Sequence, residues 1–169
     1  MKKGSSKIWF TFDMKTPGAI FIKLVEPLVP HIDVKHIGNE LIRHAKETGE
    51  ANCRFVCRLM PVDILCKANC FDDFKRFAKP ALDKALLEHR NSVEDKEKPI
   101  LWCLEMKRRN NEKIPKKDYL DFLCAEIDNG KNPVSYDYAD IEVVVEVFRD
   151  LLILSILPGY KRDFKKYNL

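Results

Sequence analysis

The residues best suited to chemistry in this chain are cations gathered in two short stretches. The first, "LEMKRRNNEKIPKK" at 104–117, contains Lys107, Arg108, Arg109, Asn110, Asn111, Lys113, Lys116 and Lys117. The second lies near the C-terminus and contains Lys161, Arg162, Lys165 and Lys166. Lysine and arginine displace counterions from phosphates, and asparagine hydrogen-bonds to a nucleic-acid backbone or to base edges. The two stretches therefore predict a surface that binds a polyanion.

The distribution of charge supports this interpretation. The 169-residue chain has a net charge of +4, whereas 107–117 carries +5 and 161–166 carries +3, so the rest of the chain is net negative. Concentrated positive charge is typical of a protein with a polyanionic partner. Two solvated loops would give the same pattern, and the sequence leaves that alternative open.

Three aromatic residues, Tyr160, Phe164 and Tyr167, alternate with the cations of the second stretch. Aromatic rings stack on unpaired bases while neighbouring cations hold the backbone, an arrangement typical of proteins that bind single-stranded or loop RNA. The alternative is that the rings belong to the core and only the cations reach solvent. The sequence does not decide between the two.

The cysteine spacing suggests a metal site, but its geometry argues against one. Cys53, Cys57, Cys66 and Cys70 follow a C-x3-C-x8-C-x3-C pattern. If residues 52–62 form a strand, Cys53 and Cys57 lie about 13 Å apart. Two thiolates bound to one zinc lie within about 4 Å of each other. Small buried side chains are therefore the favoured interpretation of these cysteines.

Signatures of catalysis are missing from the sequence. None of the six glycines pairs with another at the spacing of a phosphate-binding or dinucleotide-binding loop. The four histidines show no metal-ligand pattern, and no Cys–His nucleophile can be assigned. We therefore expect a binding protein without cofactor, metal or catalytic residues.

Apolar patterning predicts a mixed α/β chain with the order ββαβαβαββ. Strands are expected at 7–13, 19–25, 52–62, 99–109, 141–148 and 151–157. Helices are expected after Asp33, after Asn69 and from Pro115, the second kinked or broken near Lys79 because Pro80 follows. The first should end at Gly49, and its apolar residues recur on one face: Val34, Ile37, Leu41, Ile42 and Ala45. The first basic stretch thus joins a strand to a helix whose N–H groups also attract anions.

Composition places the chain among ordinary globular proteins, with 46% hydrophobic and 33% charged residues. The longest apolar run, "LLILSIL", is far shorter than the roughly 20 residues of a membrane-spanning helix. No secretion signal is apparent, so we expect reduced cysteines and a location in the nucleus, nucleolus or cytoplasm.

Four stretches, "FIKLVEP", "RFVCRLMPVDILCKA", "KRRNN" before a helix, and "VVVEVFRDLLILSIL" leading to "YKRDFKKYNL", resemble THUMP-domain proteins. The resemblance is to the eukaryotic adaptor branch that supports cytidine N4-acetylation of tRNA. It implies a small ferredoxin-like unit at 1–60 and a THUMP domain at 61–169. Only "MKTPG" joins the first two strands, where similar proteins have a helix and an acidic insertion, so the completeness of the first unit is left open.

The resemblance also implies a function. THUMP domains dock tRNA for a modification enzyme, and the adaptor branch presents serine and leucine tRNAs to a separate RNA cytidine acetyltransferase. We expect Arg54, Arg58, Lys67 and the 107–117 stretch to form one basic face, which the C-terminal cations extend. The alternatives are a protein-interaction scaffold with a basic face, a general RNA-binding module, or a small enzyme.

Overall fold

The computed structural model describes residues 9–12, 18–24, 31–49, 56–109 and 111–169. Its strands are β1 (Trp9–Phe12), β2 (Phe21–Leu24), β3 (Ile64–Lys67), β4 (Trp102–Arg109), β5 (Ile141–Phe148) and β6 (Leu151–Pro158). Its helices are α1 (Val34–Thr48), α2 (Phe71–Ser92) and α3 (Lys116–Glu126), with a 3-10 turn at Lys165–Tyr167. The mixed α/β fold class is confirmed. Within the described residues, no helix has the length and apolar character needed to cross a bilayer.

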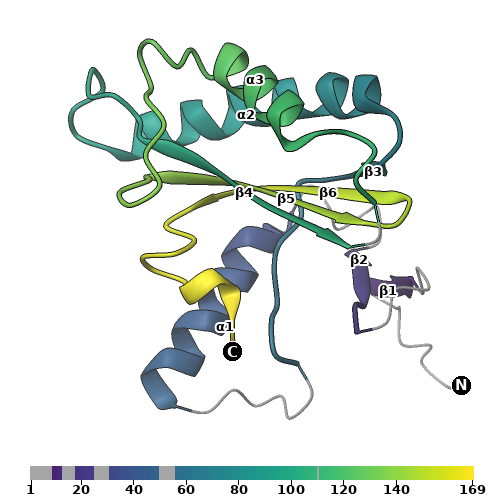
Figure 1. Ribbon diagram of the computed structural model, residues 1–169. Coiled ribbons are helices and arrows are strands. Elements are labelled where there is room, and N and C mark those ends of the chain that lie inside the picture. The colour runs from purple at the N-terminus through teal and green to yellow at the C-terminus, as the bar shows by residue number, and fades with distance from the viewer. Residues whose placement is uncertain (1–8, 13–17, 25–30, 50–55, 110) are drawn as a thin grey trace, which may run out of the picture.

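A four-stranded sheet with the order β3-β6-β5-β4 forms the centre of the molecule. β4 runs parallel to β5, whereas β6 is antiparallel to both β5 and β3. The helices α2 and α3 cover one face, while α1 and the C-terminal segment lie against the other (Figure 1). β1 and β2 form a separate antiparallel hairpin.

The main core lies between the sheet and α2 and α3. Alternate residues of β5, such as Val143 and Val145, pack there beside Phe74 and Ala78 of α2 and Leu123 of α3. All eight residues of β5 are buried, as are six consecutive residues of β6, because both faces of the sheet are covered. The β-branched and aliphatic runs that predicted these two strands therefore reflect their burial.

Helix α1 has the ends that the sequence predicts. The carboxylate of Asp33 accepts a hydrogen bond from the Lys35 amide at 2.8 Å, and Gly49 ends the helix with a φ of 71°. Its buried face is narrower than expected. Ile42 packs against the sheet and Gly38 approaches Pro61, whereas the predicted apolar residues Val34, Ile37 and Leu41 are 41–47% exposed. The prediction of one continuous buried stripe was wrong in this respect.

The prediction of a strand at 52–62 was also wrong for residues 56–62. Residues 52–55 lie outside the described part, and over 56–62 the chain forms no strand, only an isolated bridge between Arg58 and Asn168. The strand that pairs with β6 is β3, four residues long, just after Pro61 and Val62. Around this bridge the Leu59 amide donates to the Tyr167 carbonyl, and the Leu169 amide donates to the Cys57 carbonyl, which is too little pairing to form a strand.

Helix α2 differs from its prediction at two points. It begins at Phe71 after Cys70, one residue later than an Asn69 cap would place it, and it continues through Pro80 without a break. The buried residues Phe74, Ala78, Leu82 and Ala85 lie on both sides of the proline. Their packing against the sheet offsets the roughly 3 kcal/mol that an interior proline costs.

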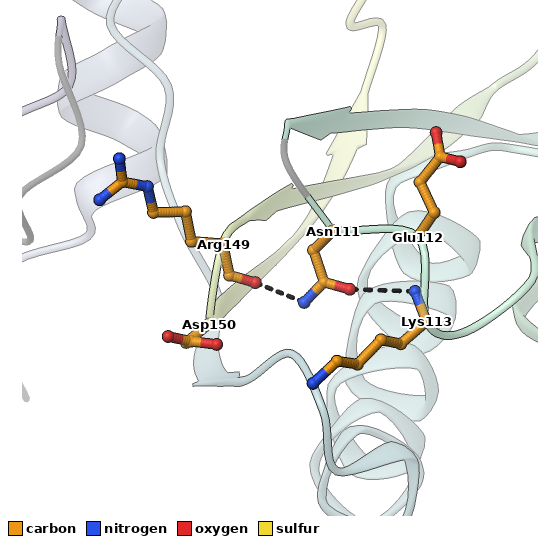
Figure 2. Close-up of a pocket in the computed structure, with 5 residues that line it drawn as sticks. All are labelled: Asn111, Glu112, Lys113, Arg149 and Asp150. Atoms are coloured by element: carbon orange, nitrogen blue, oxygen red, sulfur yellow. Dashed lines mark hydrogen bonds between the residues drawn. The ribbon is translucent and has the colours of Figure 1, made fainter.

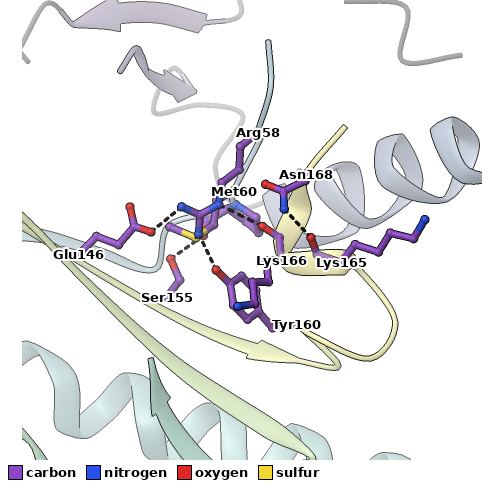
Figure 3. A network of polar contacts seen from close by, with 9 residues as sticks. Arg58, Met60, Glu146, Ser155, Tyr160, Lys165, Lys166 and Asn168 are labelled. Carbon is purple, nitrogen blue, oxygen red and sulfur yellow. Dashed lines mark hydrogen bonds and ion pairs between the residues drawn. The ribbon is translucent and has the colours of Figure 1, made fainter. Parts of the chain in front are cut away.

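A polar network fastens the C-terminal segment to the second face of the sheet (Figure 3). The Arg58 guanidinium forms an ion pair with Glu146 of β5 and donates to the Tyr160 hydroxyl at 2.7 Å. Its Nε donates to the Lys166 carbonyl at 3.0 Å. The Glu146 side chain is 6% exposed, so Arg58 neutralises a buried carboxylate. This contact also joins the predicted units at 1–60 and 61–169, whose boundary stays a prediction.

The C-terminal aromatic rings belong to the core. Tyr160 and Tyr167 are each 1% exposed, and Phe164 stacks on Tyr167 with ring centroids 5.2 Å apart. All three rings pack in a cluster with Ile42 and Leu157. The buried tyrosine rings cannot stack on bases, so the core interpretation is the correct one for Tyr160 and Tyr167.

Replacing Phe74 by alanine should lower the free energy of unfolding by about 3–5 kcal/mol, because its buried ring contacts Phe71, Tyr119 and Phe122. The matched control is Phe77→Ala on the same helix, since that side chain is 41% exposed. Urea denaturation of both variants checks the expectation. Equal losses would contradict the packing of α2 described above.

Replacing Arg58 by alanine should cost about 3–5 kcal/mol, because the Glu146 carboxylate stays buried without its partner. Glu146→Gln in the Arg58→Ala background should recover part of the loss. Arg76→Ala, which removes an exposed pair with Asp73, should cost less than about 1 kcal/mol. The account of the network fails if Arg58→Ala and Arg76→Ala unfold at the same denaturant concentration.

Candidate nucleic-acid interface

The sheet register places cations from distant parts of the sequence at one end of the sheet. Lys67 of β3 is level with Leu151 of β6, which is level with Phe148 of β5 and, through it, with Arg109 of β4. Because β3, β4 and β5 run in the same direction, their carboxyl ends meet there. We call this end, with the loops that leave it, the basic edge. Its cations are Lys67, Lys107, Arg108, Arg109, Lys113, Lys116, Lys117 and Arg149.

The connection from β4 through α3 to the parallel strand β5 explains why a ligand would meet this edge. In open α/β sheets, ligands bind at the carboxyl ends of the strands, where helices begin with their N–H groups directed outward. Helix α3 begins within the basic stretch, at Lys116, and its N-cap residue is Pro115, whose side chain has no group that could bond to the first amides of the helix. Lys116 and Lys117 occupy its first turn and are exposed.

Most cations of the basic edge are free of ion pairs. Within the part of the chain that the structure describes, no carboxylate pairs with Lys67, Lys107, Arg108, Arg109, Lys113, Lys116 or Arg149, and each side chain is exposed. Lys117 pairs with Asp121 one turn along α3. Outside the basic edge, Lys35, Arg58 and Lys79 pair with carboxylates, whereas the exposed Lys165 and Lys166 form no ion pair within the described residues. Unpaired cations need not break an internal contact before they meet a phosphate.

Strand alternation distributes these cations over both faces of the sheet. Side chains at Trp102, Leu104 and Met106 pack toward α2 and α3, which places Arg108 on that face. Lys107 and Arg109 therefore project from the opposite face, and the Arg109 guanidinium lies over the Phe148 ring at 5.4 Å. The positive charge thus wraps around the end of β4.

An open hollow of about 850 Å³ lies beside the end of β4, lined by Asn111, Glu112, Lys113, Arg149 and Asp150 (Figure 2). Arg149, with a φ of 51°, occupies the two-residue turn between β5 and β6, and its amide donates to the Arg109 carbonyl at 3.0 Å. Sequence reasoning missed Arg149 as a candidate site residue. Arg149 directly follows a predicted strand, and this position could have indicated a site residue. That inference requires the knowledge that β5 lies parallel to β4, which the sequence does not supply.

The other predicted residues have different surroundings. Arg54 and Asn110 lie outside the described residues. The guanidinium of Arg58 is engaged in the network with Glu146 and Tyr160 rather than directed to solvent.

The C-terminal cations are separate from the basic edge. They follow Pro158, which is level with Ile141 and Trp102 at the opposite end of the sheet (Figure 1). Lys161 pairs with Glu105, and Arg162 hydrogen-bonds to Asp163 and holds the pKa of that carboxyl below its usual value. Lys165 and Lys166 are exposed. The structure therefore does not join these residues to the 107–117 stretch.

Two of the described thiols, Cys66 and Cys103, are poorly suited to nucleophilic chemistry. Burial raises the pKa of Cys66 and of Cys103 to about 11, so both thiols are protonated at neutral pH. Among the described residues, no group of three or more histidine, cysteine or acidic side chains could hold a metal ion. Cys53, one of the four cysteines of the zinc-like pattern, lies outside this part of the chain.

Comparisons with known proteins agree with the fold. No protein-family model matches the chain. The "THUMP domain-containing protein 1 homolog" of Drosophila melanogaster is 30% identical over 162 residues, which cover 93% of this chain and 44% of that protein. "THUMP domain-containing protein 1" of Homo sapiens is 23% identical over 140 residues, which cover 82% of this chain and 37% of that protein.

Among solved structures, PH1313 from Pyrococcus horikoshii has the same fold, with a TM-score of 0.56 and 18% identity over 89% of this chain and 44% of that chain. Measured against the curated relatives, the chain spans less than half of their length. The likeness to the Drosophila melanogaster and Homo sapiens proteins extends over most of the chain. These similarities support a THUMP-domain protein of the THUMP domain-containing protein 1 type.

Proposed function

We propose that this chain binds tRNA through the basic edge and serves tRNA modification. The observation that carries the proposal is the set of exposed cations at the carboxyl ends of β3, β4 and β5, most of which have no carboxylate partner among the described residues. Lys67, Lys107, Arg108, Arg109, Lys113, Lys116, Lys117 and Arg149 supply the charge, and the first turn of α3 supplies N–H groups. The relationship to THUMP domain-containing protein 1 supports RNA as the polyanion.

The finer form of the proposal is an adaptor without catalytic residues of its own. It would present serine and leucine tRNAs to a separate RNA cytidine acetyltransferase, which carries out N4-acetylation in the nucleus, nucleolus or cytoplasm. The absence of a glycine-rich cofactor loop from the sequence supports this form. So do the protonated thiols of Cys66 and Cys103.

Phosphate contacts should dominate the affinity. Duplex RNA is recognised mainly by its shape and through phosphates and 2′-hydroxyls, because side chains cannot enter its narrow major groove. The cations of the basic edge lie on both sides of the β4 end and along the following loop, which suits contact with several phosphates in a row. Affinity that depends on phosphates falls steeply as salt rises.

The variant Lys107→Ala/Arg108→Ala/Arg109→Ala tests the proposal. Its affinity for tRNA should fall by about 10-fold to 100-fold, and the slope of log K against log[salt] should become shallower by about 2, since up to three phosphate contacts are lost. Fluorescence anisotropy with labelled tRNA at several salt concentrations measures both quantities.

The matched control is Lys84→Ala/Lys96→Ala/Lys131→Ala, which removes the same charge from exposed positions outside the basic edge. It should change the affinity by less than about threefold, since only the long-range field is altered. The proposal fails if the two triple variants weaken binding equally, or if the slope of the unsubstituted chain is close to zero.

A protein-interaction scaffold is the alternative that the charge distribution leaves open. Excess bulk RNA would leave an acidic protein bound to a scaffold, whereas it should compete with tRNA for the basic edge. For an adaptor, the purified chain should not acetylate tRNA from acetyl-coenzyme A. Acetylation by the purified chain alone, measured as radiolabel incorporated into tRNA, would show that it is an enzyme.

A further inference from the structure

Both N–H donors of the Asn111 side chain are used within the basic edge. Its Nδ2 donates to the Arg149 carbonyl and, at 3.0 Å, to the Asn69 Oδ1. Its Oδ1 accepts from the Lys113 amide at 3.1 Å (Figure 2). A primary amide has two N–H donors. Both are therefore used within the protein, and neither is left for a base or a phosphate.

These contacts join three loops that are far apart in the sequence. Asn69 lies between β3 and α2, Asn111 between β4 and α3, and Arg149 in the turn between β5 and β6. Asn69 extends the connection, since its Nδ2 donates to the Asp150 carboxylate at 3.3 Å. The backbone adds a further link from the Ala68 amide to the Asp150 carbonyl at 2.8 Å.

Each loop carries cations of the basic edge. Lys67 precedes the Asn69 loop, Lys113 lies in the Asn111 loop, and Arg149 forms the third loop. Two of the three bonds to Asn111 involve the backbone of a cationic residue, namely the Arg149 carbonyl and the Lys113 amide. Asn111 is therefore bonded to the backbone at two of the unpaired cations, and the Arg149 amide is held in addition by the Arg109 carbonyl.

We infer that Asn111 is a positioning residue for tRNA binding: together with Asn69 it clasps the three loops and fixes the spacing of Lys113 and Arg149 for neighbouring phosphates, without itself touching RNA. The inference rests on the proposed function. It replaces direct RNA contact as the role of Asn111, and it gives Asn69 a role that the sequence does not suggest. Preorganised cations bind phosphates more tightly, because less side-chain and loop entropy is lost on binding.

The test is a double-mutant cycle with Asn111→Ala, Asn69→Ala and the double variant, using tRNA anisotropy over a range of salt concentrations. Asn111→Ala should weaken binding about fivefold, and the salt slope should become shallower by about 1 as one phosphate contact is lost. Asn69→Ala should weaken binding less, and the double variant should be no weaker than Asn111→Ala, because both changes open the same clasp. Asn91→Ala, an exposed asparagine on α2, is the matched control and should change neither quantity.

Direct contact between Asn111 and a base would give a different pattern. Asn111→Ala would then weaken binding at an unchanged salt slope, and its effect would add to that of Asn69→Ala. Either observation overturns the inference, as does unchanged binding by Asn111→Ala.

Thermal unfolding of each variant shows that the chain remains folded at the assay temperature. If the unsubstituted chain binds no tRNA, the proposed function fails instead, so the two failures are distinguishable.

Discussion

The parallel pairing of β4 with β5 is the constraint on which the rest of the structure depends. It aligns Arg109 with Phe148, and the β5–β6 hairpin together with β3 then brings Arg149 and Lys67 to the same end of the sheet. A shift of one residue in the β4 register would exchange the two faces of that strand. Lys107 and Arg109 would then face α2 and α3, while Leu104 would leave the main core. The apolar core and the basic edge are thus determined by one register.

Coverage of both sheet faces explains where a ligand can bind. β5 and β6 are buried on both sides, by α2 and α3 on one face and by α1 and the C-terminal segment on the other. Several polar and aromatic side chains hold α1 and the C-terminal segment on the second face of the sheet. Arg58 neutralises Glu146, and Tyr160 and Tyr167 fill space beside Ile42. The strand ends and the loops that leave them remain free for a partner.

The sequence predicted the elements whose signals are local. The β-branched run at 141–148 gave β5 with its observed bounds, and Asp33 and Gly49 gave both ends of α1. β3 was missed because four residues carry too little pattern, and the apolar residues of 56–62 were assigned to a strand although no neighbouring strand pairs with them. Pairing between distant strands is not encoded locally, so Arg149 and Asn69 could not be placed beside Lys113. For the same reason, the sequence could not decide whether Tyr160 and Tyr167 were buried.

Crosslinking of the chain to bulk tRNA, followed by peptide mapping, tests the central claim most directly, because it reports both the class of partner and the face that binds. The account predicts crosslinks within 107–117 and around Arg149 and Lys67, and few from the 3-10 turn at Lys165–Tyr167. Crosslinks concentrated in the C-terminal segment would contradict the account, as would a chain that tRNA does not crosslink at all.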